Sequence, residues 1–338
     1  MKKIVGNILI AYGCAVTSVS GQAAGFTTID VADQGQPDLQ VGLWYPTSEQ
    51  PPAAANTKFG LSVAHDALLH KPNGGLVVIS HGYSGWYAGH ADTAAALADA
   101  GFIVAAPTHT GNTWSDMSSA PDQWALDRPR HATKVIDHML NAHEFSSVID
   151  GESIGVYGFS AGGYTAVGLI GGVPDFAVAT QHCEQQPEEF VCADGLIGAL
   201  ISADMQSLPD EAWGYDARIS AAVISAPGWG FAYTANSLVR VSADVQLWSG
   251  KLDESVPTAS NAALLAQRLP TTPETHWVED ANHFAFLTVP CREAFKKEDP
   301  DEYEMICGDA DGFDRHKFHD DMHAEMVRFY KESFSLDR

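Results

Sequence analysis

The feature that most constrains the fold is a repeated alternation of continuously apolar runs with longer amphipathic stretches. Such runs are typical of parallel strands that are covered on both faces. Parallel strands need crossover connections, and right-handed βα crossovers build a sheet that winds in both directions. We therefore expect one α/β domain from about Ala24 onward, with a doubly wound, mostly parallel sheet. Strands are predicted at residues 39–45, 76–80, 102–106, 153–157, 221–225, 245–248 and 275–278, and helices at 90–100, 122–141, 161–170, 258–268 and 316–334.

Two segments interrupt this alternation. Residues 173–218 contain prolines, acidic residues and two cysteines where a βα unit needs only a short connection. We expect them to form a cap inserted beside the carboxyl ends of the strands, covering Ser160. Residues 290–314 are acidic and are expected to be irregular up to the last helix.

The charge balance excludes several classes of protein. The chain has 19 Lys and Arg against 43 Asp and Glu, a net charge of −24. It therefore offers no basic surface for nucleic acid or anionic lipid. With 45% hydrophobic and 18% charged residues, the composition is that of a packed globule rather than a disordered chain.

The first 23 residues have the order of a secretory signal peptide. Lys2 and Lys3 precede an apolar stretch over residues 4–19, and small residues end at Ala23, after which we expect cleavage. A membrane anchor is the alternative, but the stretch is short and is interrupted by small and polar residues. Lipidation at Cys14 is a second alternative. We expect a secreted or periplasmic protein with no stable membrane insertion.

Removing this peptide leaves four cysteines, Cys183, Cys192, Cys291 and Cys307. An even number in an oxidising compartment predicts disulfides, and three pairings are possible. Pairing of sequence neighbours, Cys183 with Cys192 and Cys291 with Cys307, is favoured because both pairs lie in polar, loop-like stretches. Buried free thiols are the alternative. A zinc site is disfavoured because no Cys-x-x-Cys pair is present.

The segment Gly158–Gly162 has the pattern G-x-S-x-G between an apolar strand and a helical run. This is the pattern of a nucleophile elbow, in which a serine sits in a strained turn. Glycines at the flanking positions allow strand and helix to approach closely. The pattern predicts that Ser160 is a nucleophile; a structural glycine turn is the alternative.

A serine nucleophile needs a histidine base and an orienting carboxylate, which follow it in the order Ser, acid, His. Asp253 lies just after the predicted strand at 245–248, and His283 lies just after the one at 275–278. We therefore expect Ser160, Asp253 and His283 to form a catalytic triad. Glu254 is a second candidate for the acid, and Asp280 a third.

The transition state of acyl transfer also needs donors for an oxyanion. The first is expected to be the amide of Tyr83, in the turn after the strand at 76–80, and the second the amide of Ala161. His81 has the wrong place in the chain for a catalytic base, so we interpret it as a residue that stabilises this turn. Aromatic side chains expected to bind substrate are Tyr83, Trp86, Phe159 and Trp229, with Phe231 as a further candidate.

Two weaker patterns lie near the C-terminus. The first is a set of three histidines at helical spacing, His316, His319 and His323. The second is a set of three aspartates around a glycine, Asp309, Asp311 and Asp314. A metal site is conceivable in each. An ordinary amphipathic helix and an acidic solvated loop are favoured, so no metal is predicted.

Taken together, five segments of the chain resemble the α/β-hydrolase superfamily. They are residues 76–85, 102–109, Gly158–Gly162, 249–257 and 282–284. More narrowly, the chain is similar to secreted proteins called predicted dienelactone hydrolases and to platelet-activating-factor acetylhydrolases. The resemblance covers most of the mature chain, with the cap as the least matched part. True dienelactone hydrolases use a cysteine where this chain has Ser160.

These observations predict a secreted serine carboxylic-ester hydrolase that needs no cofactor and acts on small or short-chain esters. A peptidase or amidase on the same triad is the nearest alternative, and a lipase or polyester hydrolase is another. The alternative from a different class is a non-catalytic binding protein with the same fold.

Overall fold

The computed structural model describes residues 23–193, 198, 205, 207–288, 291 and 293–336. The expected signal peptide lies outside these residues except for Ala23, the first residue of β1. The strands are β1 (Ala23–Val31), β2 (Leu39–Thr47), β3 (Ala64–His65), β4 (Leu76–Ser80), β5 (Ile103–Pro107), β6 (Ile154–Phe159), β7 (Ile219–Ser225), β8 (Asp244–Gly250) and β9 (Glu274–Val278). The α-helices are α1 (Ala91–Asp99), α2 (Pro121–Asn141), α3 (Ala161–Leu169), α4 (Phe176–Gln185), α5 (Phe190–Ala193), α8 (Ala262–Arg268), α9 (Glu293–Glu298), α10 (Pro300–Cys307) and α11 (Arg315–Ser333). Short 3-10 helices are η1 (Glu144–Val148), η2 (Asp210–Trp213), η3 (Gly230–Ala232) and η4 (His283–Phe286).

The nine strands form one mixed sheet in the order β3-β1-β2-β5-β4-β6-β7-β8-β9. Strand β2 is antiparallel to both β1 and β5, whereas the six strands in the order β5-β4-β6-β7-β8-β9 are parallel to one another. Every residue of β4, β5 and β6 is buried, as expected for strands covered on both faces. The prediction of an α/β architecture with a mostly parallel sheet is confirmed.

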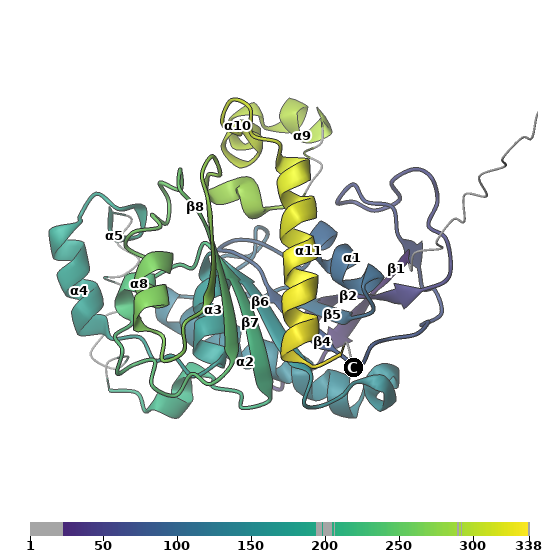
Figure 1. Cartoon of the computed structure of the whole chain (residues 1–338), viewed down its shortest axis with the longest axis horizontal. Helices are drawn as coiled ribbons and strands as arrows, with labels where there is room; N and C mark the ends of the chain where they lie inside the picture. Colours follow the sequence, from purple (N-terminus) through teal and green to yellow (C-terminus); the bar gives the residue numbers. More distant parts are fainter. Residues whose placement is uncertain are drawn as a thin grey trace, which may run out of the picture.

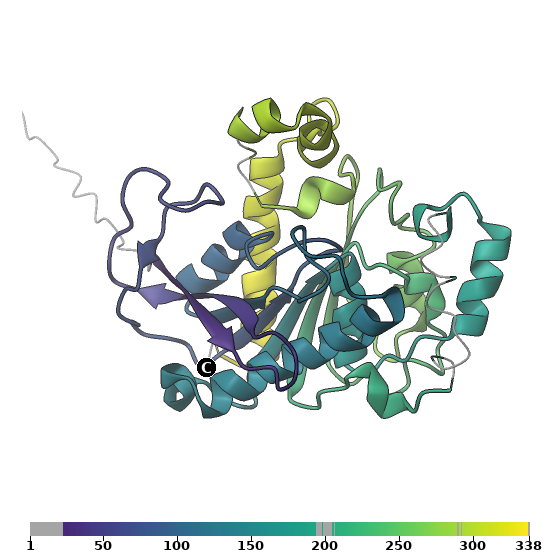
Figure 2. The ribbon, with the colours of Figure 1, turned by 180° about the vertical axis from the view of Figure 1, so that it is seen from behind.

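Helices cover both faces of this sheet. One hydrophobic cluster packs α1 and α11 against one face, and another packs α2, α3 and α8 against the other. Figure 1 shows α11 across the first face, and Figure 2 shows α2 across the opposite face. Because the strands from β5 to β9 are parallel, their carboxyl ends meet at one edge, where ligands of open α/β sheets bind.

Two predictions about local structure differ from the structure. Strands β1 and β3 were not expected; β1 pairs with β2 over nine residues, a contact that only the folded hairpin reveals. The prediction of an irregular segment at 290–314 is wrong, because α9 and α10 lie within it. The Asp299 side chain accepts a hydrogen bond from the Glu302 amide, and Pro300 occupies the first turn of α10. This aspartate cap with a following proline is a common helix start.

The insertion at 173–218 contains α4, α5 and η2. Its described part packs against the turn at η3: the rings of His182 and Phe231 stack at 4.1 Å, and the Asp175 amide donates to Ala232 O at 2.6 Å. A cavity of about 480 Å³ lies within this region, lined by Phe176 and Trp213 among others. Residues 194–197, 199–204 and 206 of the insertion lie outside the described residues. Its role as a cover for Ser160 therefore stays a prediction.

Both favoured disulfides are present. Cys183 is bonded to Cys192, and Cys291 to Cys307. Such bonds form and persist in oxidising compartments and fit an exported protein. Among the helices of the described residues, none is both long and apolar enough to cross a membrane.

Reduction of the disulfides should lower the melting temperature by several degrees. The bonds close loops with sequence separations of 9 and 16 residues, each worth about 3 kcal/mol in the chain-entropy model. Calorimetry with and without a reductant measures this shift, and non-reducing peptide mapping verifies the pairings. An unchanged melting temperature after complete reduction would contradict the prediction.

Candidate functional site

Ser160 occupies a sharp turn between the end of β6 and the start of α3. Its φ of 55° and ψ of −118° are strained for a residue with a side chain. A Cβ at Gly158 would lie 2.1 Å from Gly162 O, and one at Gly162 would lie 1.9 Å from Ser80 O. Both flanking glycines are therefore required by the close approach of β4, β6 and α3.

Loops after three parallel strands bring Ser160, Asp253 and His283 together. The His283 Nε2 lies 3.0 Å from Ser160 Oγ, and its Nδ1 lies 2.7 Å from Asp253 Oδ2. Asp253 is 5% exposed and also accepts a hydrogen bond from the Val256 amide at 2.7 Å. Both alternative acids, Glu254 and Asp280, are exposed. The imidazole thus has a hydroxyl on one side and a fixed carboxylate on the other, which is the arrangement that lets a base take a serine proton.

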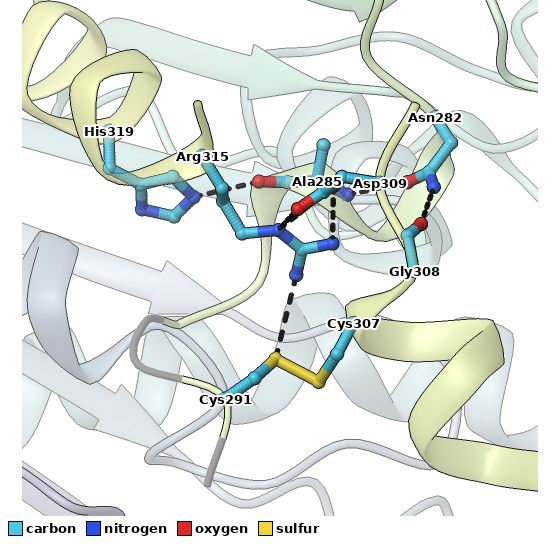
Figure 3. The surroundings of a disulfide bond; sticks show 8 residues. All are labelled: Asn282, Ala285, Cys291, Cys307, Gly308, Asp309, Arg315 and His319. Carbon is cyan, nitrogen blue, oxygen red and sulfur yellow. Dashed lines mark hydrogen bonds and ion pairs between the residues drawn. A yellow bond between two sulfur atoms is a disulfide. The ribbon is translucent and has the colours of Figure 1, made fainter. Parts of the chain in front are cut away.

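The turn that carries His283 is held by its neighbours. The Asn282 side chain accepts a hydrogen bond from the Ala285 amide at 2.9 Å and donates one to Gly308 O at 2.6 Å. Gly308 follows Cys307, so the Cys291–Cys307 disulfide is one residue away from this contact (Figure 3). The role of Asn282 was not predicted from the sequence, although an asparagine just before a helical turn is a known capping signal.

The two expected oxyanion donors lie on segments beside Ser160. Ala161 is the first residue of α3, where backbone N–H groups have no acceptor within the helix. Gly82 precedes Tyr83, and a Cβ at Gly82 would lie 3.5 Å from Ser160 Cβ. The turn that contains Tyr83 therefore lies against the serine.

The predicted substrate-binding aromatics fall into separate groups. The Trp124 ring lies 5.8 Å from that of Tyr83 and 5.2 Å from that of Trp229. Trp229 directly follows Gly228, whose amide donates to Ser160 O at 2.9 Å, so this group lies beside the serine. Trp124 was not predicted, because one tryptophan in an amphipathic helix is indistinguishable from a core residue in the sequence.

The other candidates are placed differently. Phe159 is buried, and its ring centroid lies 4.9 Å from that of His283. Trp86 packs instead against Phe59 and Tyr87 in the cluster beneath the N-terminal strands. Phe231 is buried and stacks on His182 of the insertion.

Of the three C-terminal histidines, two face inward. His319 and His323 lie with Asp92 so that one ligand atom of each is within 4.8 Å of the others, while His316 is exposed. His319 places Nδ1 at 2.6 Å from Asp92 Oδ2 and Nε2 at 2.7 Å from Ala285 O, shown in part in Figure 3. Both partners are acceptors, so both ring nitrogens carry protons and His319 is an imidazolium. Burial lowers its pKa, but the Asp92 carboxylate and the Ala285 carbonyl outweigh this and raise the pKa overall. The geometry therefore favours an ion pair over a metal site.

Two of the three C-terminal aspartates have partners, and Asp311 is exposed. Asp309 accepts hydrogen bonds from the Arg315 guanidinium, and Asp314 caps α11 by accepting from the Lys317 amide. A second group that could hold a cation is Glu274, His276 and Glu325 on the surface. Its carboxylates also form ion pairs, with Arg328.

Neither the protein-family models nor the curated proteins against which the sequence was compared match this chain.

Proposed function

We propose that the protein is a serine-dependent carboxylic-ester hydrolase of the α/β-hydrolase type. The observation that carries this proposal is the continuous hydrogen-bond path from Ser160 Oγ through His283 to Asp253, with distances of 3.0 and 2.7 Å. The strained elbow between β6 and α3 and the chain order Ser, acid, His support the same conclusion. So does the position of all three residues after the carboxyl ends of parallel strands.

In the proposed mechanism, Ser160 Oγ attacks the ester carbonyl carbon while His283 Nε2 takes the hydroxyl proton. The carbonyl oxygen becomes an oxyanion, which the amides of Tyr83 and Ala161 stabilise. His283 then donates the proton to the leaving alcohol, and the C–O bond breaks to leave an acyl-serine. A water molecule, deprotonated by the same imidazole, releases the acid and restores Ser160. Asp253 stabilises the imidazolium in both halves of the cycle.

We propose that the substrates are small or short-chain esters. The packed rings of Tyr83, Trp124 and Trp229 beside Ser160 favour a compact acyl group. The net charge of −24 gives no attraction to anionic lipid surfaces. The signal-peptide pattern and the two disulfides support action outside the cytoplasm.

Activity-based labelling and a substrate panel test the function. A fluorophosphonate probe should label the wild-type protein at Ser160, and p-nitrophenyl acetate should be hydrolysed much faster than the matching p-nitroanilide. Comparable anilide turnover would indicate an amidase. Absence of both labelling and turnover would indicate a binding protein.

Acyl-chain length provides a separate prediction. Turnover of p-nitrophenyl esters should fall steeply from acetyl or butyryl toward palmitoyl, because the rings that we propose to contact the acyl group, those of Tyr83, Trp124 and Trp229, pack closely together beside Ser160. The rate should show no increase where the substrate forms micelles. A maximum at long acyl chains, or interfacial activation, would contradict this and indicate a lipase.

A further inference from the structure

A cluster of buried polar residues that sequence analysis did not single out lies beneath the proposed oxyanion site. At its centre is Arg128 of α2, whose side chain is fully buried. No carboxylate of the residues described above lies within 4.0 Å of its guanidinium. Burying a cation without a counter-ion strongly opposes folding. A purely structural position would be filled at lower cost by a neutral side chain, so this arrangement points to a functional use.

The Arg128 guanidinium joins several segments at once. It donates to the Ser80 hydroxyl at 3.4 Å and to the His81 carbonyl, both at the end of β4. It also donates from Nη1 to Asn112 Oδ1 at 2.6 Å, in the loop after β5, and from Nε to Thr165 Oγ1 at 3.1 Å, in α3. The planar, five-donor fork of arginine is suited to holding several acceptors in fixed positions.

Two of these contacts reach the backbone segments that carry the proposed oxyanion donors. The Thr165 hydroxyl that accepts from Arg128 itself donates to Ala161 O at 3.0 Å, in the residue whose amide is the second donor. The His81 carbonyl belongs to the turn that contains the Tyr83 amide. Arg128 therefore ties together the β4 turn and the first turn of α3, which carry one donor each.

His81 fixes the direction in which the Tyr83 N–H points. Its Nε2 accepts a hydrogen bond from the His109 amide at 3.1 Å, so the ring proton is on Nδ1, which donates to Gly82 O at 2.7 Å. In a trans peptide the N–H points away from the preceding C=O. Fixing Gly82 O therefore fixes the orientation of the Tyr83 N–H. Burial and the Arg128 charge hold the pKa of His81 well below its usual value, so the ring stays neutral and keeps this tautomer.

The segment around Arg128 is itself braced against α3. Pro129 has no N–H, so Ala125 O lacks its usual helical donor. The Tyr164 hydroxyl supplies the missing hydrogen bond at 3.2 Å. The part of α2 that carries Arg128 is thereby attached to the same helix that carries the Ala161 amide.

We propose that Arg128 is a positioning residue that sets the relative placement of the Tyr83 and Ala161 amides and provides positive charge behind them. This inference rests on the proposed ester hydrolysis. Its effect belongs to the transition state, because the oxyanion exists only after Ser160 has attacked the carbonyl.

Arg128→Met and Arg128→Lys test this role. In Arg128→Met, kcat for p-nitrophenyl acetate should fall about 100-fold or more, as when one oxyanion donor is lost, with KM changed less than about threefold. The affinity for a trifluoromethyl ketone, which forms an oxyanion on the serine, should fall by a similar factor. Arg128→Lys keeps the charge but not the fork and should show an intermediate loss of about tenfold.

Circular dichroism and the melting temperature show whether each variant is folded. All rates are expressed per folded molecule. Arg328→Met removes a surface charge that pairs with Glu274, Glu325 and Glu332 and should leave both kcat and inhibitor affinity unchanged. If Arg128→Met lowers only the melting temperature, while kcat and ketone affinity per folded molecule stay at wild-type values, the inference is wrong.

If Arg128→Met does not fold, the kcat and the ketone affinity of Arg128→Lys test the inference instead. A parallel loss in kcat and ketone affinity supports the inference, and wild-type values for both overturn it. The proposed function is judged separately, on the wild-type protein: if it shows neither ester turnover nor fluorophosphonate labelling, ester hydrolysis is wrong independently of Arg128.

Discussion

Ser160→Ala is expected to lower kcat/KM for p-nitrophenyl acetate by about four to six orders of magnitude. The reason is that no acyl-serine can form, while the substrate pocket and the oxyanion donors remain. The fold should be preserved, because alanine differs from serine only by the hydroxyl and keeps the same Cβ at the strained turn. Initial rates with the purified variant measure the effect.

Ser147→Ala is the matched control. Ser147 is exposed in the short helix η1, which precedes β6, whereas the elbow follows that strand. Its rate and fluorophosphonate labelling should equal those of the wild type. If the Ser160→Ala variant retains wild-type turnover, Ser160 is not the nucleophile.

Acidification is expected to unfold the protein between about pH 6.5 and 4. Burial lowers the pKa of His90, His131 and His323 to about 4 each, and together with the Arg128 charge it holds the pKa of His81 and His109 well below the usual value. Between these values and 6.5 the unfolded chain binds more protons than the folded one, so stability decreases as the pH falls. A shift from 6.5 to 4 is worth about 3 kcal/mol for each histidine, and several such shifts equal the whole stability of a typical domain.

The raised pKa values of two other groups, Asp99 and His319, favour folding at lower pH and so oppose this loss of stability on acidification. Desolvation raises the pKa of Asp99 to about 6, but this residue is exposed and its contribution is screened by solvent. The raised pKa of His319 gives stability that is complete below pH 6.5 and is lost as the pH rises through its folded value. Stability should therefore have its maximum near or slightly above pH 6.5.

Urea unfolding followed by circular dichroism from pH 4 to 9 tests this profile. His323→Gln removes one buried imidazole and should move the acid midpoint to lower pH. His316→Gln, on the exposed side of the same helix, should leave the midpoint unchanged. A wild-type protein that is fully folded and equally stable at pH 4 and 7 would contradict the prediction.

The elbow and the triad could be predicted because their signals are local. Gly158 and Gly162 flank the serine in sequence, and Asp253 and His283 each follow a segment that is predicted to be a strand. The contacts of Arg128 could not be predicted. In the sequence it is one charged residue in an amphipathic helix, and its burial depends on Ser80, Asn112 and Thr165, which come from three separate segments.

The helices at 290–314 were missed for a different reason. Acidic composition was interpreted as irregular structure, although Asp299 with Pro300 is a local helix signal. Strand β1 begins at the expected cleavage point, and no strand was predicted there. The connection between β1 and β2 runs over residues 32–38 and contains Gly35 and Pro37, but it is longer than the two-residue turn that marks a tight hairpin in a sequence.

The separation of Ser160 and His283 by 123 residues has a consequence in time. We expect the hydroxyl and the imidazole to meet only after β7, β8 and β9 have joined the sheet, since each of these strands pairs with the one before it. Contacts this distant in sequence form slowly during folding. If the protein is refolded from denaturant, we therefore expect the proposed ester turnover to return later than the helix content.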